Sequence, residues 1–259
     1  MNRVKSRFAL LLEQKAKALI PYIMAGDPDL AATVRLIAAL VEAGVDLIEV
    51  GVPFSDPLAD GAVIQAAGQR ALRNGCTVEK IFKTLKPVLA DLPIPALLMI
   101  YYNQIYQRGV AAFLEAAAIA GVSGLIIPDL PPDDSEELQQ LAPQYRIALN
   151  FLVAPTSTKA RMIKVAEAST GFVYAVSLKG VTGVRQSLPP ELPQFIRNVK
   201  AVTSKPVAVG FGIATPEQAH LVAGLADGVI VGSAVVQAAA SDPTFKQVKA
   251  LVSGIKKAL

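Results

Sequence analysis

The stretch LIEVGVPFSDPLADGAVIQAAGQRALRN, residues 47–74, contains one complete unit of strand, loop and helix. Its apolar run Leu47–Gly51 predicts a buried parallel strand, and Val63–Asn74 predicts a helix. The loop between them carries Pro and Asp residues, which favour turns. Because strands that alternate with helices form parallel sheets, this stretch predicts an α/β protein.

The same alternation extends outward from this unit to both ends of the chain. Short apolar runs predict eight strands, at Leu19–Ala25, Leu47–Gly51, Ala96–Tyr101, Gly124–Ile127, Ile147–Leu152, Phe172–Ser177, Pro206–Gly210 and Gly228–Val231. Helices are predicted at Ser6–Lys15, Asp29–Ala43, Val63–Asn74, Val78–Leu89, Gly109–Ala120, Asp133–Leu141, Lys159–Ala168, Pro190–Val202, Thr215–Ala223 and Pro243–Ala258. Asp29 and Thr215 are predicted N-caps, and Gly44 and Gly75 are predicted to follow helix ends.

Eight such units in 259 residues, without a break in composition, predict a single-domain (β/α)8 TIM barrel over residues 1–259 with extra terminal helices. An open doubly wound sheet is the alternative, but it often carries a Gly-rich turn after its first strand. Here that strand ends in Gly26-Asp27-Pro28, without a GxGxxG motif. In a barrel, the chemistry lies at the carboxyl ends of the strands and in the loops that follow.

Composition excludes several classes of protein. Hydrophobic residues make up 53% of the chain and charged residues 18%, which favours one large core over disorder. A single Cys (Cys76) and a single His (His220) exclude an internal disulfide and metal sites built from several Cys or His, so no metal is expected. The lone Cys also suits a reducing compartment.

Charge and hydropathy make nucleic acid or a membrane an unexpected partner. The net charge is +4, with no dense basic cluster beyond Arg3, Lys5 and Arg7. The apolar run Phe8–Leu12 is too short for a signal peptide, and no apolar stretch of about 20 residues is present. We therefore expect a cytoplasmic protein.

Small residues gather in the loops after the last three predicted strands, at Gly180, Gly183, Gly210, Gly212, Gly232 and Ser233. Such loops let backbone N–H groups approach an anion, and a helix that opens at Ser233 would favour negative charge at its amino end. Barrels often bind phosphate in this place. The alternative is that the glycines only turn the chain.

Two carboxylates stand out. Glu49 interrupts the apolar run of its strand, and a buried carboxyl there has a raised pKa that suits proton transfer. The alternative places its side chain against a helix, paired with a Lys. Asp60 lies on the long loop that follows, where it is either an N-cap of the next helix or a second catalytic carboxylate.

The remaining candidates have simpler interpretations. Asp27 and Asp129 are predicted turn formers, His220 a surface or packing residue and Cys76 an inert one. Five residues on or near strands are either core or, if they face the barrel mouth, an apolar pocket suited to a flat ring: Tyr22, Met99, Tyr101, Ile126 and Leu152.

The motif IEVGVPFSDPLADG closely resembles the signature of the tryptophan synthase alpha chain family. The similarity extends along almost the whole chain, through PYIMAGDPD, YYN, IIPDLP, SLKGVTG, PVAVGFGI and DGVIVGSA. The resemblance implies a barrel lyase of tryptophan biosynthesis that cleaves indole-3-glycerol phosphate to indole and glyceraldehyde 3-phosphate. It also implies an alpha2beta2 complex with a beta chain, which alone carries pyridoxal phosphate, so this chain needs no cofactor.

The resemblance assigns roles residue by residue. Glu49 matches the family's general acid/base, and Asp60 matches the carboxylate that assists at the indole nitrogen. The indole pocket is implied at Tyr22, Met99, Tyr101, Ile126 and Leu152. Further substrate contacts, to the phosphate or at the reacting end, are implied at Tyr174, Thr182, Gly183, Phe211, Gly212, Gly232 and Ser233. The loops Pro53–Asp60 and Ser177–Pro190 would move.

The chain departs from the family pattern at a few positions. Many members have Asn-Pro after the third strand, where this chain has Asn103-Gln104, and Ala62 stands where Pro is common. Lys179 lies in a loop position that is often uncharged. Three rival functions stay open: a Schiff-base aldolase with Lys179 as nucleophile, a stand-alone indole-releasing lyase and a non-catalytic binding subunit.

Overall fold

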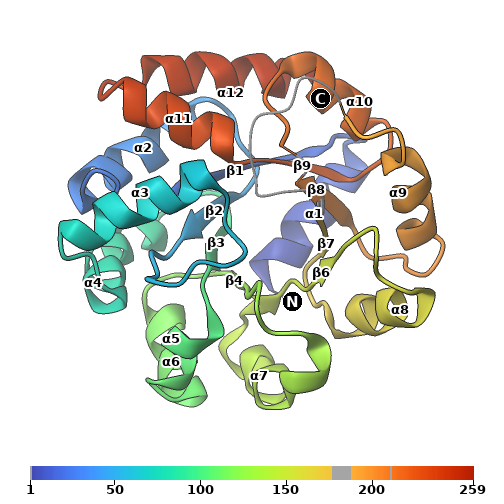
Figure 1. Cartoon of the computed structure of the whole chain (residues 1–259), viewed down its shortest axis with the longest axis horizontal. Helices are drawn as coiled ribbons and strands as arrows, with labels where there is room; N and C mark the ends of the chain where they lie inside the picture. Colours follow the sequence, from blue (N-terminus) through green and yellow to red (C-terminus); the bar gives the residue numbers. More distant parts are fainter. Residues whose placement is uncertain (1, 177–187, 211) are drawn as a thin grey trace.

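The computed structural model describes residues 2–176, 188–210 and 212–259, and its strands form a parallel barrel with helices around it (Figure 1). Each strand pairs with neighbours in parallel register. The sheet order is β5-β4-β3-β2-β1-β9-β8-β7-β6. The described strands are β1 (Ala18–Met24), β2 (Ile48–Gly51), β3 (Ala96–Met99), β4 (Gly124–Ile126), β5 (Ala148–Leu149), β6 (Leu152–Val153), β7 (Val173–Val176), β8 (Val207–Gly210) and β9 (Gly228–Val231).

The predicted fifth strand is divided into β5 and β6, and this division closes the barrel. β5 pairs with β4, whereas β6, a few residues later, pairs with β7. Asn150 lies between them and bonds to both sides: its Nδ2 donates to the Leu125 carbonyl at 3.1 Å, and the Phe172 N–H donates to its Oδ1 at 2.9 Å. The two ends of the sheet order are therefore one continuous piece of chain, which excludes the open doubly wound sheet.

The helices confirm most of the predicted elements but differ from the prediction in three places. A short helix, α5, follows β3, the predicted helix at Asp133–Leu141 begins as a 3₁₀ turn, and the carboxyl-terminal segment forms two helices. The helices are α1 (Arg3–Glu13), α2 (Leu30–Glu42), α3 (Ala62–Arg73), α4 (Val78–Ala90), α5 (Tyr102–Tyr106), α6 (Val110–Ile119), η1 (Pro132–Asp134), α7 (Glu136–Leu141), η2 (Ala142–Tyr145), α8 (Lys159–Ala168), α9 (Leu192–Lys200), α10 (Pro216–Ala223), α11 (Ser233–Ser241) and α12 (Lys246–Ala258). No helix within the described ranges is long and apolar enough to cross a membrane.

Local signals in the sequence explain where several helices begin and end. The Asp29 carboxylate accepts a bond from the Ala32 N–H, and Thr215 accepts one from the Gln218 N–H, so both predicted N-caps are confirmed. Gly44 and Gly75 adopt φ of +84° and +67° after helix ends, a conformation that glycine reaches without strain.

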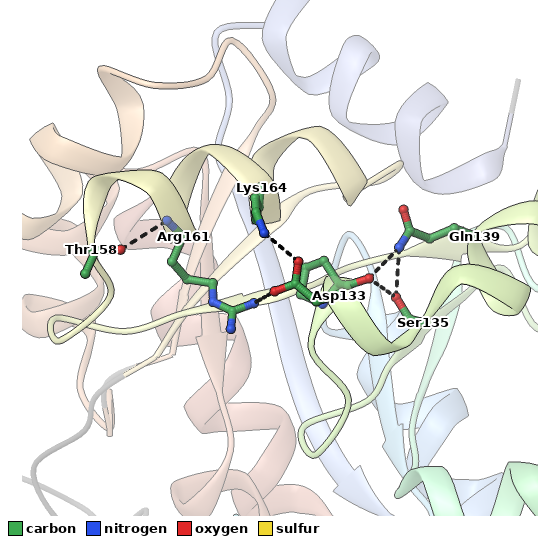
Figure 2. A network of polar contacts seen from close by, with 7 residues as sticks. Asp133, Ser135, Gln139, Thr158, Arg161 and Lys164 are labelled. Atoms are coloured by element: carbon green, nitrogen blue, oxygen red, sulfur yellow. Dashed lines mark hydrogen bonds and ion pairs between the residues drawn. The ribbon is translucent and has the colours of Figure 1, made fainter.

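Ion pairs join η1 to α8 on the surface of the barrel. Asp133 of η1 forms ion pairs with Arg161 and Lys164 of α8 (Figure 2).

Alternate strand residues fill the barrel interior, and α1 covers one end of it. Ile20, Leu47, Leu97 and Phe172 belong to one buried cluster with Val4, Phe8 and Leu11 of α1. The intervening strand residues pack outward against the helices in a second, larger cluster. Because α1 covers the end from which the strands start, the free end of the barrel is the carboxyl end.

Asp46 joins the two terminal helices to the barrel. Its side chain is 2% exposed and lies 2.6 Å from Arg7 of α1 and 2.5 Å from Lys256 of α12. Its second oxygen also accepts the Leu19 N–H of β1 at 2.8 Å. One buried carboxylate therefore neutralises two cations and satisfies a strand N–H.

Asp46→Ala is expected to lower the free energy of unfolding by about 2–4 kcal/mol, because it leaves two half-buried cations and a backbone donor without their acceptor. Urea unfolding measures the change. Glu42→Gln, which removes an exposed pair between α2 and Lys249 of α12, is the control, with an expected loss under about 1 kcal/mol. Equal losses in the two variants would contradict a special role for Asp46.

Candidate functional site

Glu49 lies inside the barrel near its carboxyl end. It occupies β2 in register with Tyr22 of β1 and Leu97 of β3, and its exposed fraction is zero. It shares a strand face with Leu47, which belongs to the interior cluster. The alternative that Glu49 pairs with a Lys against a helix is therefore wrong.

Two tyrosines lie beside this carboxyl group because two strand glycines make room for them. A side chain at Gly51 would overlap the Tyr22 hydroxyl. A Cβ atom at Gly210 would lie 3.0 Å from the Tyr174 hydroxyl oxygen. Gly210 ends β8, as the predicted strand Pro206–Gly210 has it, and borders this tyrosine. Its predicted approach to an anion stays a prediction.

Burial raises the pKa of Glu49 from 4.5 to about 8, and the charge of Asp60 adds to the rise. The Tyr174 hydroxyl opposes this rise through a polar interaction, although neither carboxyl oxygen of Glu49 has a hydrogen-bond partner of normal length among the described residues. At neutral pH the side chain is therefore mainly a neutral acid that can donate a proton.

Asp60 ends the loop between β2 and α3, and its side chain turns toward the same space. Gly61, not Asp60, is the N-cap of α3, so the alternative that Asp60 caps this helix is wrong. Asp60 is 8% exposed, and burial raises its pKa from 3.8 to about 6, while a hydrogen bond from Tyr101 opposes the rise. At neutral pH Asp60 is therefore mainly an anion.

The loop that carries Asp60 is held by the segment after β3. The Ala59 N–H donates to the Tyr101 hydroxyl at 3.0 Å, and the Phe54 ring stacks on the Tyr101 ring with centroids 5.1 Å apart. Leu58, at the outer turn of the loop, is 93% exposed. The loop thus has a fixed inner side and an open outer side.

Four of the predicted indole-pocket residues lie on the strands β1, β3, β4 and β6, and Tyr101 lies just after β3. Tyr22, Tyr101 and Ile126 are buried, whereas Met99 and Leu152 are half-buried. Met99 pairs with Ile126 on one side of the barrel, and Leu152 pairs with Tyr174 on another. The expectation that they form an apolar mouth is consistent with this placement and stays a prediction.

The predicted phosphate-binding residues are only partly described. Gly212 follows β8 with φ of +71°, and Gly232 is the N-cap of α11, whose first residue is Ser233. The N-cap Gly232 has no side chain to cap α11, and the Val235 N–H donates to the Gly232 carbonyl at 2.9 Å. An anion would therefore be bound by the earlier N–H groups of this helix. Thr182, Gly183 and Phe211 lie outside the described residues, as do Lys179, Gly180 and most of the loop Ser177–Pro190.

The other strand-end residues have structural contacts. Asp27 forms a two-bond ion pair with Arg70, at 2.7 and 2.8 Å, rather than only turning the chain. Asp129 accepts the Tyr102 N–H at 2.9 Å and so holds the start of α5.

His220 and Cys76 lie away from the strand ends. His220 forms a hydrogen bond with the Ala258 carbonyl at 2.9 Å on the surface. Burial raises the pKa of the Cys76 thiol to about 11.

Sequence reasoning missed the roles of Gly51 and α5. A glycine inside an apolar strand was a visible signal for a close approach at Gly51, whereas α5 is too short to show a helical period. Among the described residues, no group of three His, Cys, Asp or Glu side chains is placed to hold a metal ion. The expectation of no metal stays a prediction.

A closed parallel barrel with two buried carboxyl groups at its carboxyl end has the architecture of a TIM-barrel enzyme. A family model described as tryptophan synthase alpha chain matches residues 8–257. The chain therefore belongs to the tryptophan synthase alpha chain family.

Individual relatives match over the whole chain. The tryptophan synthase alpha chain of Dehalococcoides mccartyi is 44% identical over 259 residues, all of both chains. That of Carboxydothermus hydrogenoformans is 48% identical over 237 residues, which cover 92% of this chain and 89% of the other. A solved structure of Mycobacterium tuberculosis tryptophan synthase is 40% identical in sequence and has a TM-score of 0.92. The match covers 99% of this chain and 98% of the chain in that structure.

The predicted fold and enzyme class are confirmed by these likenesses. The chain has a (β/α)8 barrel and is a carbon–carbon lyase of tryptophan biosynthesis, which cleaves indole-3-glycerol phosphate to indole and glyceraldehyde 3-phosphate. The family does not by itself assign the roles of individual side chains.

In the native protein, ionisation of Glu49 is expected to lower the free energy of unfolding as the pH rises. Glu49→Gln is expected to remove this loss. Because the pKa of Glu49 is raised in the folded state, folded protein holds a proton that unfolded protein releases, so stability falls between about pH 4.5 and pH 8. Gln does not titrate, so the variant gains stability over the native protein as pH rises through this window. Urea unfolding across the pH range measures the difference. Glu115→Gln, on the exposed face of α6, is the control, and an unchanged pH dependence in Glu49→Gln would contradict the buried neutral acid.

Proposed function

We propose that Glu49 and Asp60 divide the acid–base work of indole-3-glycerol phosphate cleavage. The observation that carries this proposal is the difference between their environments: burial raises the pKa of Glu49 to about 8 and that of Asp60 to about 6. At neutral pH one group is a proton donor and the other an anion. Two carboxyl groups held in different protonation states are the usual basis of such a division.

In the first step, Glu49 donates its proton to C3 of the indole ring, and the ring nitrogen becomes positively charged. The Asp60 carboxylate lies beside this nitrogen and stabilises its charge. Because both groups lie in a site with little water, the attraction is stronger than it would be in bulk solvent.

In the second step, ionised Glu49 removes the proton from the side-chain hydroxyl. The bond between C3 and the hydroxyl-bearing carbon breaks, and its electron pair returns to the ring. The products are indole and the aldehyde of glyceraldehyde 3-phosphate. Glu49 regains the proton that it gave, so the cycle closes without a metal or an imine.

The remaining site residues bind the two ends of the substrate. Apolar contacts from Tyr22, Met99, Tyr101, Ile126 and Leu152 surround the indole ring, and Tyr174 lies at the reacting end. The amino end of α11, at Gly232 and Ser233, binds the phosphate together with Gly212, Gly183 and Phe211. Thr182 contacts the Asp60 loop when the loops close.

The chain works as one catalytic domain, residues 1–259, within a larger enzyme. A tryptophan synthase beta chain is the partner in an alpha2beta2 complex and carries the pyridoxal phosphate, while this chain uses no cofactor of its own. Membership of the alpha chain family supports this assignment, and a biosynthetic role with a single thiol suits the cytoplasm.

Glu49→Gln is expected to abolish indole release while it preserves substrate binding, because Gln keeps the shape of the side chain but cannot donate and recover the proton. Indole release is followed by steady-state kinetics and binding by calorimetry, with Glu115→Gln as the control of unchanged activity. Near-normal turnover by Glu49→Gln would overturn the role of Glu49.

The partner is tested by indole release from indole-3-glycerol phosphate with and without a tryptophan synthase beta chain. Slow release alone and strong acceleration by the beta chain are expected for an alpha subunit whose loops close on contact. Fast release that ignores the beta chain would identify a stand-alone lyase instead. No release in either condition would contradict the roles of Glu49 and Asp60.

A further inference from the structure

We propose that Gln104 is a positioning residue that fastens the Pro53–Asp60 loop to α5 and thereby keeps Asp60 facing Glu49. This inference rests on the proposed function of Asp60, and it concerns a side chain that has no part in the chemistry.

The tether is a single hydrogen bond between two half-buried segments. The Gln104 Nε2 donates to the Pro53 carbonyl at 3.1 Å. Its Oε1 is buried without a partner among the described residues, so the donor end alone orients the amide. The opposite orientation would place two oxygens against each other. A proline at position 104 has no side-chain donor and could not form this bond.

The element that carries Gln104 is itself fixed on both sides. Asp129, in the turn after β4, accepts the Tyr102 N–H at the start of α5. Arg108 donates to the Gln104 carbonyl at 2.7 Å and to Glu79 of α4 at 2.8 Å. The tether therefore joins the loop to a braced helix rather than to a free segment.

The loop is held at both of its ends by this segment. Near its start Gln104 holds Pro53, and near its end the Tyr101 hydroxyl accepts the Ala59 N–H at 3.0 Å, one residue before Asp60. Between these points, Leu58 has almost no protein around it. Gln65 of α3 also holds the end of the loop, because its Nε2 donates to the Asp60 carbonyl at 2.9 Å. Loss of the Gln104 bond therefore releases the start of the loop, and we expect this release to admit water beside Asp60.

Gln104→Met tests the tether, because Met keeps the length of the side chain and removes its donor. Gln139→Met is the control: Nε2 of Gln139, in α7, donates to the Pro132 carbonyl at 2.8 Å, and also to the Ser135 hydroxyl at 2.9 Å (Figure 2). We expect Gln104→Met to lower kcat for indole release by about tenfold, with a smaller change in KM, because the bound substrate faces a misplaced Asp60. Gln139→Met is expected to keep the native kcat.

The second measurement needs no substrate. The Asp60 carboxyl is titrated by carbon NMR, with Asp60→Asn to assign its signal. In the native protein it should titrate near pH 6, because burial raises the pKa of Asp60 to about 6. In Gln104→Met the titration should move toward ordinary aspartate values as water enters, and the acid limb of the kcat/KM profile should move with it.

The outcomes separate this inference from the proposed function. If folded Gln104→Met retains the native kcat and the native Asp60 titration, Gln104 has no positioning role. If the native protein releases no indole, the proposed function fails. The NMR titration still shows whether loss of the Gln104 bond changes the surroundings of Asp60. If Gln104→Met does not fold, Gln104→Asn, which shortens the amide by one methylene, is titrated in its place, with an unmoved Asp60 again overturning the proposal.

Discussion

The rest of the site depends on one unfavourable condition, a carboxyl group buried inside the barrel without a hydrogen-bond partner of normal length in the described part of the chain. Removing a carboxylate from water costs far more free energy than removing the neutral acid, so Glu49 retains its proton at neutral pH. The surrounding packed strands offset the cost of holding even the neutral group there. Asp60, on the adjacent loop, is less completely enclosed and keeps its charge. The difference between these two environments is what makes one carboxyl group an acid and the other an anion.

The enclosure of the Glu49 carboxyl group depends on small residues as much as on large ones. Without a side chain at Gly51, the Tyr22 ring reaches across from β1, and the gap at Gly210 admits the Tyr174 hydroxyl. The two phenols then enclose Glu49 with aromatic surface and leave a polar atom near it. A barrel with larger residues at these two positions would fill the same space with packed side chains. The strand glycines therefore set the space that the two tyrosines occupy beside Glu49.

Much of the fold and the pair of carboxyl groups could be predicted from the sequence, because both depend on local patterns. Apolar runs of strand length specified the strands, and Glu49 was conspicuous as the one charge inside such a run. The division of the fifth strand could not be predicted. It depends on Asn150, whose bonds reach Leu125 and Phe172 at distant places in the sequence. The N-cap of α3 was ambiguous for a related reason, since Asp60 and Gly61 are both suited to it and the tertiary position of Asp60 decides between them.

The two carboxyl groups lie on different kinds of element, and this difference has a mechanical consequence. Glu49 is fixed by strand pairing on both sides, so its position follows from the barrel itself. Asp60 lies on a loop, and its position follows from what holds that loop: the Tyr101 hydroxyl, the Phe54 stack, the amide of Gln104 and the amide of Gln65. A group on a strand can hold a proton at a fixed point, whereas a group on a loop can also leave to admit the substrate. Because three of these four holds come from Tyr101 and α5, just after β3, a contact that shifts this segment is expected to shift the loop that carries Asp60. Control of the reaction can therefore pass through the loop while the proton donor stays in place.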